Sequence, residues 1–140
     1  MNQEAINQII KLAIKSYKLD EIPVGSVIVK NGKIIGKGMN NRNSSKKITG
    51  HAEINAILDA TKKIGDWRLD GCELYVTLKP CMMCTGAIVD SRISKIYYLC
   101  DRTNVCFDCT KYIKTYKIKN NNIEKQYTEL LQQFFQNKRK

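Results

Sequence analysis

Two short motifs carry the side chains of this chain that are best suited to bind a metal ion. They are His51-Ala52-Glu53 and Pro80-Cys81-Met82-Met83-Cys84. One imidazole and two thiolates supply three zinc ligands and leave a fourth position open for water, which is the catalytic pattern, whereas structural zinc sites are closed by four ligands. The sequence therefore predicts a catalytic zinc site at His51, Cys81 and Cys84. We expect the carboxylate of Glu53 to lie beside that water without binding the metal.

Each motif alone has a less specific interpretation. A single histidine is usually an ordinary surface or core residue, and C-x-x-C also occurs in redox pairs and zinc knuckles. The combination is much less expected by chance than either part. His51 is also the only histidine in the chain, so a metal site with an imidazole ligand has to include it. These points favour the catalytic zinc interpretation.

Length and composition indicate one globular domain over residues 1–140, with 43% hydrophobic residues. No apolar run approaches the length of a membrane span, and polar residues interrupt the N-terminal segment where a signal peptide would have its apolar region. These features predict a cytoplasmic protein. In that compartment the six cysteines stay reduced, so we interpret them as metal ligands or small core residues.

The net charge of the chain is +11. Residues 109–140 contribute strongly, with eight Lys and Arg against two Glu. Such a basic segment is typical of a protein that binds a polyanion, most simply a nucleic acid. A biased genome is the competing explanation, because the chain is rich in Lys, Ile and Asn together.

The hydrophobic pattern predicts the elements that position the two motifs. We expect helices at residues 3–17, 51–63 and 124–135, and another helix that Pro80 begins. The apolar face of the first helix consists of Ile6, Ile9, Ile10, Ala13, Ile14 and Tyr17. That of the second consists of Ile54, Ile57, Leu58 and Thr61, and that of the last consists of Tyr127, Leu130, Leu131, Phe134 and Phe135. Strands are predicted at residues 22–30, 33–39, 73–78, 95–100 and 116–118, and Asn31-Gly32 predicts a hairpin turn. The alternation of strands and helices after the hairpin predicts a three-layer α/β/α sandwich around a mixed sheet.

The chain resembles the cytidine deaminase superfamily and, within it, the bacterial tRNA adenosine deaminases. The two metal motifs specify only the superfamily. The longer block at residues 74–93 resembles the tRNA branch. Shorter matches occur at Ile22-Pro23-Val24-Gly25 and Gly38-Met39-Asn40.

The resemblance implies a function and a set of residue roles. It implies conversion of adenosine to inosine at the wobble position of a tRNA anticodon, by a zinc-dependent homodimer. His51, Cys81 and Cys84 would hold the zinc, and Glu53 would shuttle protons. Substrate contacts would come from five further residues: Asn40 and the Ala52 backbone N–H on the flipped base, and Pro23, Val24 and Leu78 lining its pocket.

Three segments depart from the usual pattern of the tRNA branch. They are Lys47-Ile48-Thr49-Gly50, Lys79, and residues 104–109. Cys106 and Cys109, with Cys100 nearby, form either a second metal site or replacements for small buried residues, and we favour the second interpretation. Two other functions stay open: a deaminase of a free nucleobase or nucleoside, of cytosine or guanine type, and an inactive zinc-stabilised RNA-binding subunit. Glu53 argues against the inactive subunit, which has no need of that acid.

Overall fold

The fold is built on a five-stranded mixed sheet with the strand order β2-β1-β3-β4-β5. A computed structural model describes residues 1–103 and 107–138. β1 pairs antiparallel with both β2 and β3, whereas β3, β4 and β5 run parallel. The strands are β1 (Gly25–Lys30), β2 (Lys33–Met39), β3 (Cys72–Leu78), β4 (Lys95–Cys100) and β5 (Lys114–Lys117).

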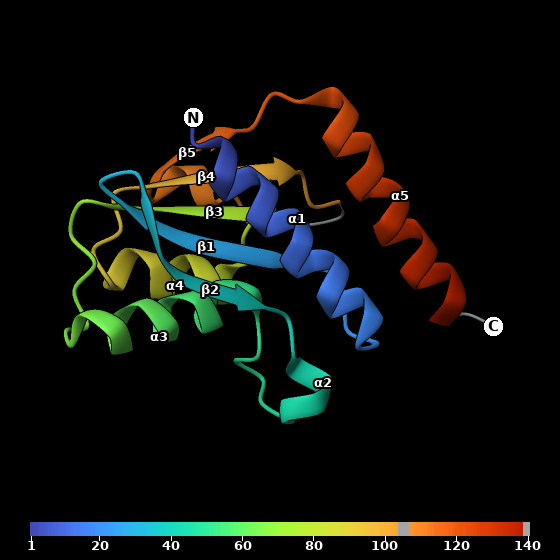
Figure 1. The fold of residues 1–140 in the computed structure, drawn as a ribbon, viewed down its shortest axis with the longest axis horizontal. Helices are drawn as coiled ribbons and strands as arrows, with labels where there is room; N and C mark the ends of the chain where they lie inside the picture. The colour runs from blue at the N-terminus through green and yellow to red at the C-terminus, as the bar shows by residue number, and fades with distance from the viewer. Residues whose placement is uncertain (104–106, 139–140) are drawn as a thin grey trace.

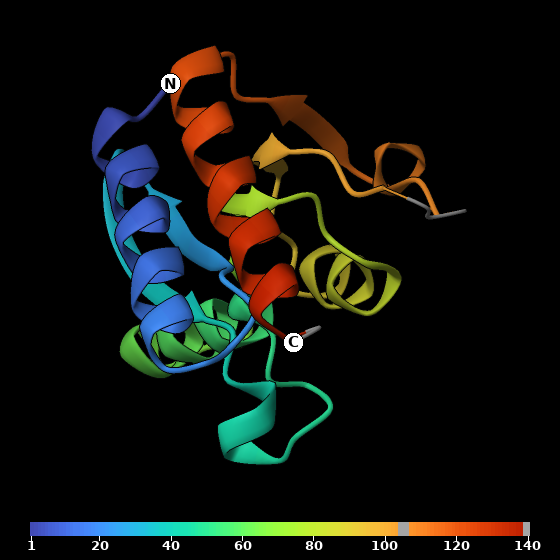
Figure 2. The ribbon, with the colours of Figure 1, turned by 90° about the vertical axis from the view of Figure 1, so that its right-hand side faces the viewer.

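Helices cover both faces of this sheet (Figure 1). One face packs against α1 (Gln3–Lys18) and α5 (Asn121–Lys138), which lie next to each other in Figure 2, and the other face packs against α3 (Ala52–Ile64) and α4 (Met82–Asp90). Each face has its own apolar cluster. The predicted three-layer α/β/α sandwich is therefore confirmed. Two short helices, α2 (Arg42–Ser45) and η1 (Cys109–Lys111), lie in connecting segments.

The first hairpin has the predicted turn. Asn31 and Gly32 have φ angles of 51° and 78°, and Lys30 and Lys33 pair on either side of them. Positive φ at both central residues is the geometry of a type I′ turn, which matches the twist of the flanking strands. The first strand begins at Gly25 and not at residue 22, so Ile22, Pro23 and Val24 precede the sheet.

The buried face of α3 matches the predicted one only in part, since Ile57 is buried and Ile54 packs against the same apolar cluster. Ala52, Ala56 and Ala60 are fully buried, whereas Leu58, predicted to point inward, is 60% exposed. The reason lies in the neighbouring strand, because a Cβ on Gly36 or Gly38 of β2 would lie within 3 Å of α3. Small residues on both elements allow this close approach. In α1, Ile14 is likewise exposed and not part of the buried face.

We expect Gly38→Ala to lower the melting temperature clearly. A Cβ at residue 38 would lie 2.3 Å from the carbonyl oxygen of Ala52 and 2.4 Å from the backbone nitrogen of Ala56. Helix α3 would have to move away from β2, and overpacking of this kind typically costs about 1–3 kcal/mol. Thermal unfolding measures the effect. Gly86→Ala in α4 is the matched control, because nothing lies within 4 Å of its Cβ position and alanine favours a helix. A stability loss as large in the control would contradict the packing explanation.

The remaining boundaries differ from the predictions by a few residues. Helix α4 begins at Met82, with Cys81 as its N-cap, and not at Pro80. The last strand is Lys114–Lys117, and α5 starts at Asn121. Asn120 caps this helix, since its side chain accepts a hydrogen bond from the backbone N–H of Ile123. Among the described helices, none combines the length and the apolar character that crossing a bilayer requires.

Candidate active site

The predicted metal ligands come together where two helices begin. His51 is the N-cap residue of α3 and Cys81 is the N-cap residue of α4, and neither side chain caps its own helix. The His51 Nδ1 atom lies 3.3 Å from the Cys84 Sγ atom and 3.7 Å from the Cys81 Sγ atom. All three candidate ligand atoms lie within 4.8 Å of one another. The site therefore presents one nitrogen and two sulfurs to a common point.

The two thiols share hydrogen bonds that favour a thiolate. A hydrogen bond from Cys84 lowers the pKa of Cys81 to about 3, and His51 and the backbone N–H of Cys84 add to this effect. The same bond raises the pKa of Cys84, which acts as the donor and is buried. A thiolate at a helix N-terminus is the form of cysteine that binds a metal.

Glu53 lies in the first turn of α3 with its carboxylate inside the protein. Its side chain is 2% exposed, and its Oε2 atom has no hydrogen-bond partner among the described residues. Burial raises the pKa of Glu53, and a hydrogen bond to its own backbone N–H opposes that shift. A buried carboxylate oxygen without a partner is costly for a folded protein, so it indicates a group that acts on a ligand.

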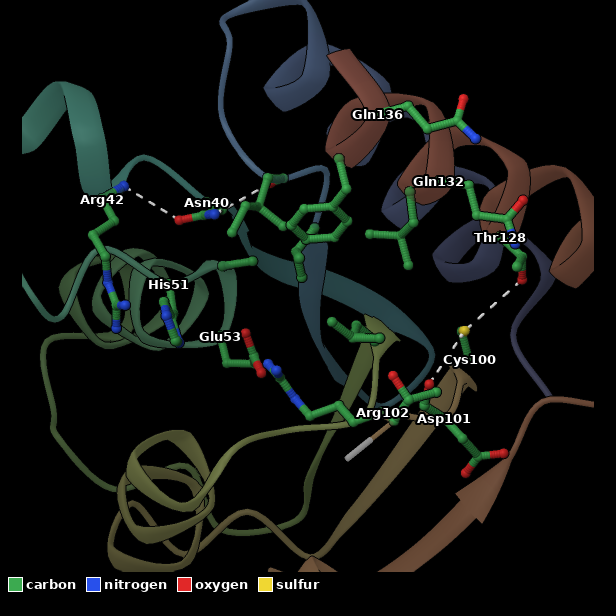
Figure 3. A pocket seen from close by; sticks show the side chains of 17 residues that line it. Asn40, Arg42, His51, Glu53, Cys100, Asp101, Arg102, Thr128, Gln132 and Gln136 are labelled. Carbon is green, nitrogen blue, oxygen red and sulfur yellow. Dashed lines mark hydrogen bonds between the residues drawn. The ribbon is translucent and has the colours of Figure 1, made fainter. Parts of the chain in front are cut away.

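A cavity of about 800 Å³ opens beside His51 and Glu53 (Figure 3). Of the residues predicted to contact a base, Val24, Asn40, Ala52 and Leu78 line it. The flanking Ile22 also lines the cavity. Pro23 does not; it is buried, and its carbonyl oxygen accepts a hydrogen bond of 2.6 Å from the Tyr127 hydroxyl. The contact of Pro23 with a base stays a prediction.

Asn40 is held in the cavity wall by hydrogen bonds on its backbone and its side chain. The side-chain Nδ2 atom donates to the carbonyl oxygen of Ile22, and the Oδ1 atom accepts from the backbone N–H of Arg42. The Asn40 carbonyl oxygen accepts a further bond from the buried Ser16 hydroxyl. These bonds fix the orientation of the amide, which is what a group that recognises one edge of a base requires.

Sequence reasoning missed the wall of the cavity that helix α5 provides. Thr128, Gln132 and Gln136 line the cavity at i, i+4 and i+8 (Figure 3). The spacing was visible in the sequence as a polar stripe beside the apolar face, but nothing in the sequence indicated that the stripe faces the metal motifs. Arg102, which also lines the cavity, was missed as well.

Two of the segments that depart from the tRNA branch contact each other. The Lys79 Nζ atom lies 3.6 Å from the Asp108 Oδ1 atom and 5.2 Å from the centre of the Tyr98 ring. Cys100 and Cys109 are buried free cysteines, in agreement with the interpretation as small core residues. Cys106 lies outside the described residues, so a second metal site that includes it is not tested.

The sandwich fold, with an imidazole and two thiols at the starts of two helices and a buried acid beside them, defines a deaminase. The model of the MafB19-like deaminase family matches residues 1–139, and the chain belongs to this family. The resemblance to bacterial tRNA-specific adenosine deaminases, inferred from the motifs, is confirmed by the curated relatives.

Two curated relatives named tRNA-specific adenosine deaminase show how far the similarity extends. The chain is 39% identical to the protein of Buchnera aphidicola over 139 residues, which cover 92% of this chain and 85% of the relative. It is 44% identical to the Bacillus subtilis protein over 93 residues, 66% of this chain. The chain thus spans 58% of the length of the Bacillus subtilis relative.

Two solved structures are similar in fold and sequence. A structure from a study of A-to-I editing by tRNA:A34 deaminases superposes with a TM-score of 0.73 and 29% identity, covering 82% of this chain and 97% of that one. Guanine deaminase from Bacillus subtilis superposes with a TM-score of 0.69 and 32% identity, covering 92% and 93%. Because the chain is similar both to a tRNA:A34 deaminase structure and to a guanine deaminase, the comparisons do not decide between their substrates. The substrate therefore has to be inferred from the site.

Proposed function

We propose that this protein is a zinc-dependent hydrolase that converts adenosine to inosine at the wobble position of tRNA. The observation that carries the proposal is the convergence of His51, Cys81 and Cys84 beside the buried acid Glu53, at the wall of a cavity larger than a single base.

Zinc fits the residues that meet at this site. A set of one imidazole and two thiols in a half-buried cluster suits the borderline-soft Zn²⁺ ion, and three ligands leave a position for water. His51 Nδ1, Cys81 Sγ and Cys84 Sγ would hold the ion. Bound there, zinc would act as a Lewis acid that lowers the pKa of water from 15.7 towards about 7.

Glu53 performs the proton transfers of the proposed reaction. Water adds to C6 of adenine, the C6–N bond breaks, and ammonia leaves. Glu53 takes one proton from the attacking water and delivers it to the ring nitrogen N1, and then takes the proton of the added hydroxyl group and delivers it to the leaving amine. Burial suits this role, because the raised pKa of Glu53 allows the carboxylate to accept a proton and then donate it.

The cavity supports the remaining roles. Asn40, held by its backbone partners, and the backbone N–H of Ala52 recognise the base, while Val24 and Leu78 pack against it. The base has to leave its stack to reach this depth, which costs little in a single-stranded anticodon loop. The net charge of +11 favours association with an RNA backbone. A tRNA substrate also implies a cytoplasmic enzyme, and we propose a homodimer, as the resemblance implies.

Deamination of a free purine base is the second candidate function. The specific observation in its favour is the similarity to guanine deaminase, which is 32% identical and covers slightly more of this chain than the tRNA:A34 deaminase structure does. The chemistry is the same in both cases, so only the substrate distinguishes them.

We expect the purified protein to form inosine at the wobble position when it is incubated with tRNA. Sequencing of the tRNA reads the product as an A-to-G change, and release of ammonia from guanine, cytosine and adenosine is measured in parallel. A tRNA transcript with guanosine at the wobble position is the control and should stay unchanged. Release of ammonia from guanine with unaltered tRNA would replace the first proposal by the second.

A further inference from the structure

Arg102 reaches the active site from the segment that follows β4. Its side chain is half-buried and lines the cavity. The Nε atom donates a hydrogen bond to the carbonyl oxygen of Lys79, and the backbone N–H of Lys79 donates to the carbonyl oxygen of Cys100 at a distance of 2.9 Å. These bonds tie Arg102 to the ends of β3 and β4, directly before the loop that carries Cys81. One nitrogen of the guanidinium is therefore tied to the backbone where β3 and β4 end.

The guanidinium of Arg102 has donors to spare. Arginine carries five N–H donors, and within the described residues the one bond to Lys79 engages only Nε. Within residues 1–103 and 107–138, no carboxylate lies within 4 Å of this guanidinium. The nearby acids have other partners, since Asp101 pairs with Lys117 at 2.9 Å and Asp108 pairs with Lys79.

Arg102 and Glu53 face the same part of the cavity. In Figure 3 the guanidinium points from the far wall towards the Glu53 carboxylate. Among the described residues the two groups form no ion pair within 4 Å, and Glu53 Oε2 has no hydrogen-bond partner there. The Arg102 guanidinium, a hydrogen-bond donor, and the Glu53 carboxylate, an acceptor, thus lie side by side where a ligand would enter the cavity. A half-buried charge without a partner is costly, so a ligand that supplies one gains affinity.

We propose that Arg102 is a substrate-binding residue, whose guanidinium donates a hydrogen bond to ring nitrogen N3 of the target purine. The inference rests on the proposed function, in which Glu53 protonates N1. In a purine ring N1 and N3 flank the same carbon, C2, so a donor beside Glu53 faces N3. Adenine offers only acceptors at its unsubstituted ring nitrogens, which suits a group that has donors alone.

The test compares two RNA substrates that differ at one atom. Anticodon stem-loops carry either adenosine or 3-deazaadenosine at the target position, and a C–H replaces the acceptor N3 in the second. Dissociation constants are measured in a Glu53→Gln background, where the substrate is not consumed, and kcat/KM is measured with Glu53 present. The variant is Arg102→Gln. The control is Arg68→Gln, which removes the same charge from an exposed arginine paired with Asp66.

We expect Arg102→Gln to weaken binding of the adenosine RNA and to lower kcat/KM by about 10- to 100-fold, the range of a hydrogen bond to a charged group. The 3-deazaadenosine RNA should bind equally weakly to Arg102→Gln and to its parent, because the contact is already lost. Arg68→Gln should alter the affinity for either RNA by no more than the loss of one positive charge from the protein surface would.

Three results would overturn the inference. If Arg102→Gln lowered the affinity for both RNAs equally, Arg102 would act by positioning the loop that carries Cys81 and not by binding N3. A loss that disappears when a methylphosphonate replaces the phosphate of the target nucleotide would assign Arg102 to that phosphate. Unchanged binding of the adenosine RNA would remove any substrate role. If the parent forms no inosine but deaminates guanine, the proposed function fails separately, and guanine with 3-deazaguanine then tests Arg102 in the same way.

Discussion

Glu53→Ala is expected to abolish inosine formation while the protein stays folded and retains zinc. Loss of a general acid–base group typically lowers a rate by roughly 10²–10⁴-fold. Glu53 serves several proton transfers in the proposed reaction, so the loss should reach the upper end of that range. Glu53→Gln should be nearly as inactive, because an amide keeps the shape of the side chain but does not shuttle protons. Single-turnover inosine formation on tRNA measures the effect.

The stability of these two variants gives an independent reading. Glu53 is 2% exposed, and one of its oxygens has no partner in the described part of the chain, so its removal eliminates a desolvation cost. We therefore expect the melting temperature to stay the same or rise. If Glu53 served only to stabilise the start of α3, its loss would cost about 0.3–1 kcal/mol and leave the rate almost unchanged. Near-normal turnover with a lowered melting temperature would thus contradict the catalytic role. Glu73→Gln, at a half-buried carboxylate paired with Lys95, is the control for a neutralised acid.

Cys81→Ser and Cys84→Ser are expected to reduce zinc from about one ion per chain to well below it. A serine hydroxyl is a much weaker zinc ligand than a thiolate, and only two strong ligands would remain. Zinc stoichiometry by elemental analysis measures the change. Because part of the free energy of metal binding stabilises the fold, the melting temperature should fall as well, and a chelator should lower that of the parent protein in the same direction.

Cys72→Ser separates the loss of a ligand from the loss of a buried thiol. Cys72 is fully buried in β3 and belongs to no metal-ligating group among the described residues. Its replacement should destabilise the protein by burying a hydroxyl group, and zinc content should not change. Full zinc binding by Cys81→Ser would contradict the assignment of that ligand. A stoichiometry of two ions per chain in the parent protein would revive the second metal site at Cys100, Cys106 and Cys109.

The local elements were largely determined by the sequence. Apolar periodicity identified the helices at both ends and the strands of the sheet, and Asn31-Gly32 specified the hairpin turn. The motifs around His51 and Cys81 place their side chains at the starts of two helices, and a three-layer sandwich brings those helix starts together. For this reason the meeting of the three candidate metal ligands beside Glu53 could be expected from the places of the two motifs in the chain.

Only the tertiary structure decided how those elements face one another. Three alanines of α3 face β2 because Gly36 and Gly38 let the helix lie close to the strand, whereas Leu58 is exposed. Thr128 and Gln132 line the same cavity as Glu53 because α5 packs at the end of the sheet where β3 and β4 finish. The bond from Arg102 to Lys79 joins residues 23 positions apart through the pairing of those strands. Periodicity describes one element at a time, whereas the rotation of a helix on a sheet and the walls of a cavity depend on contacts between residues far apart in the chain.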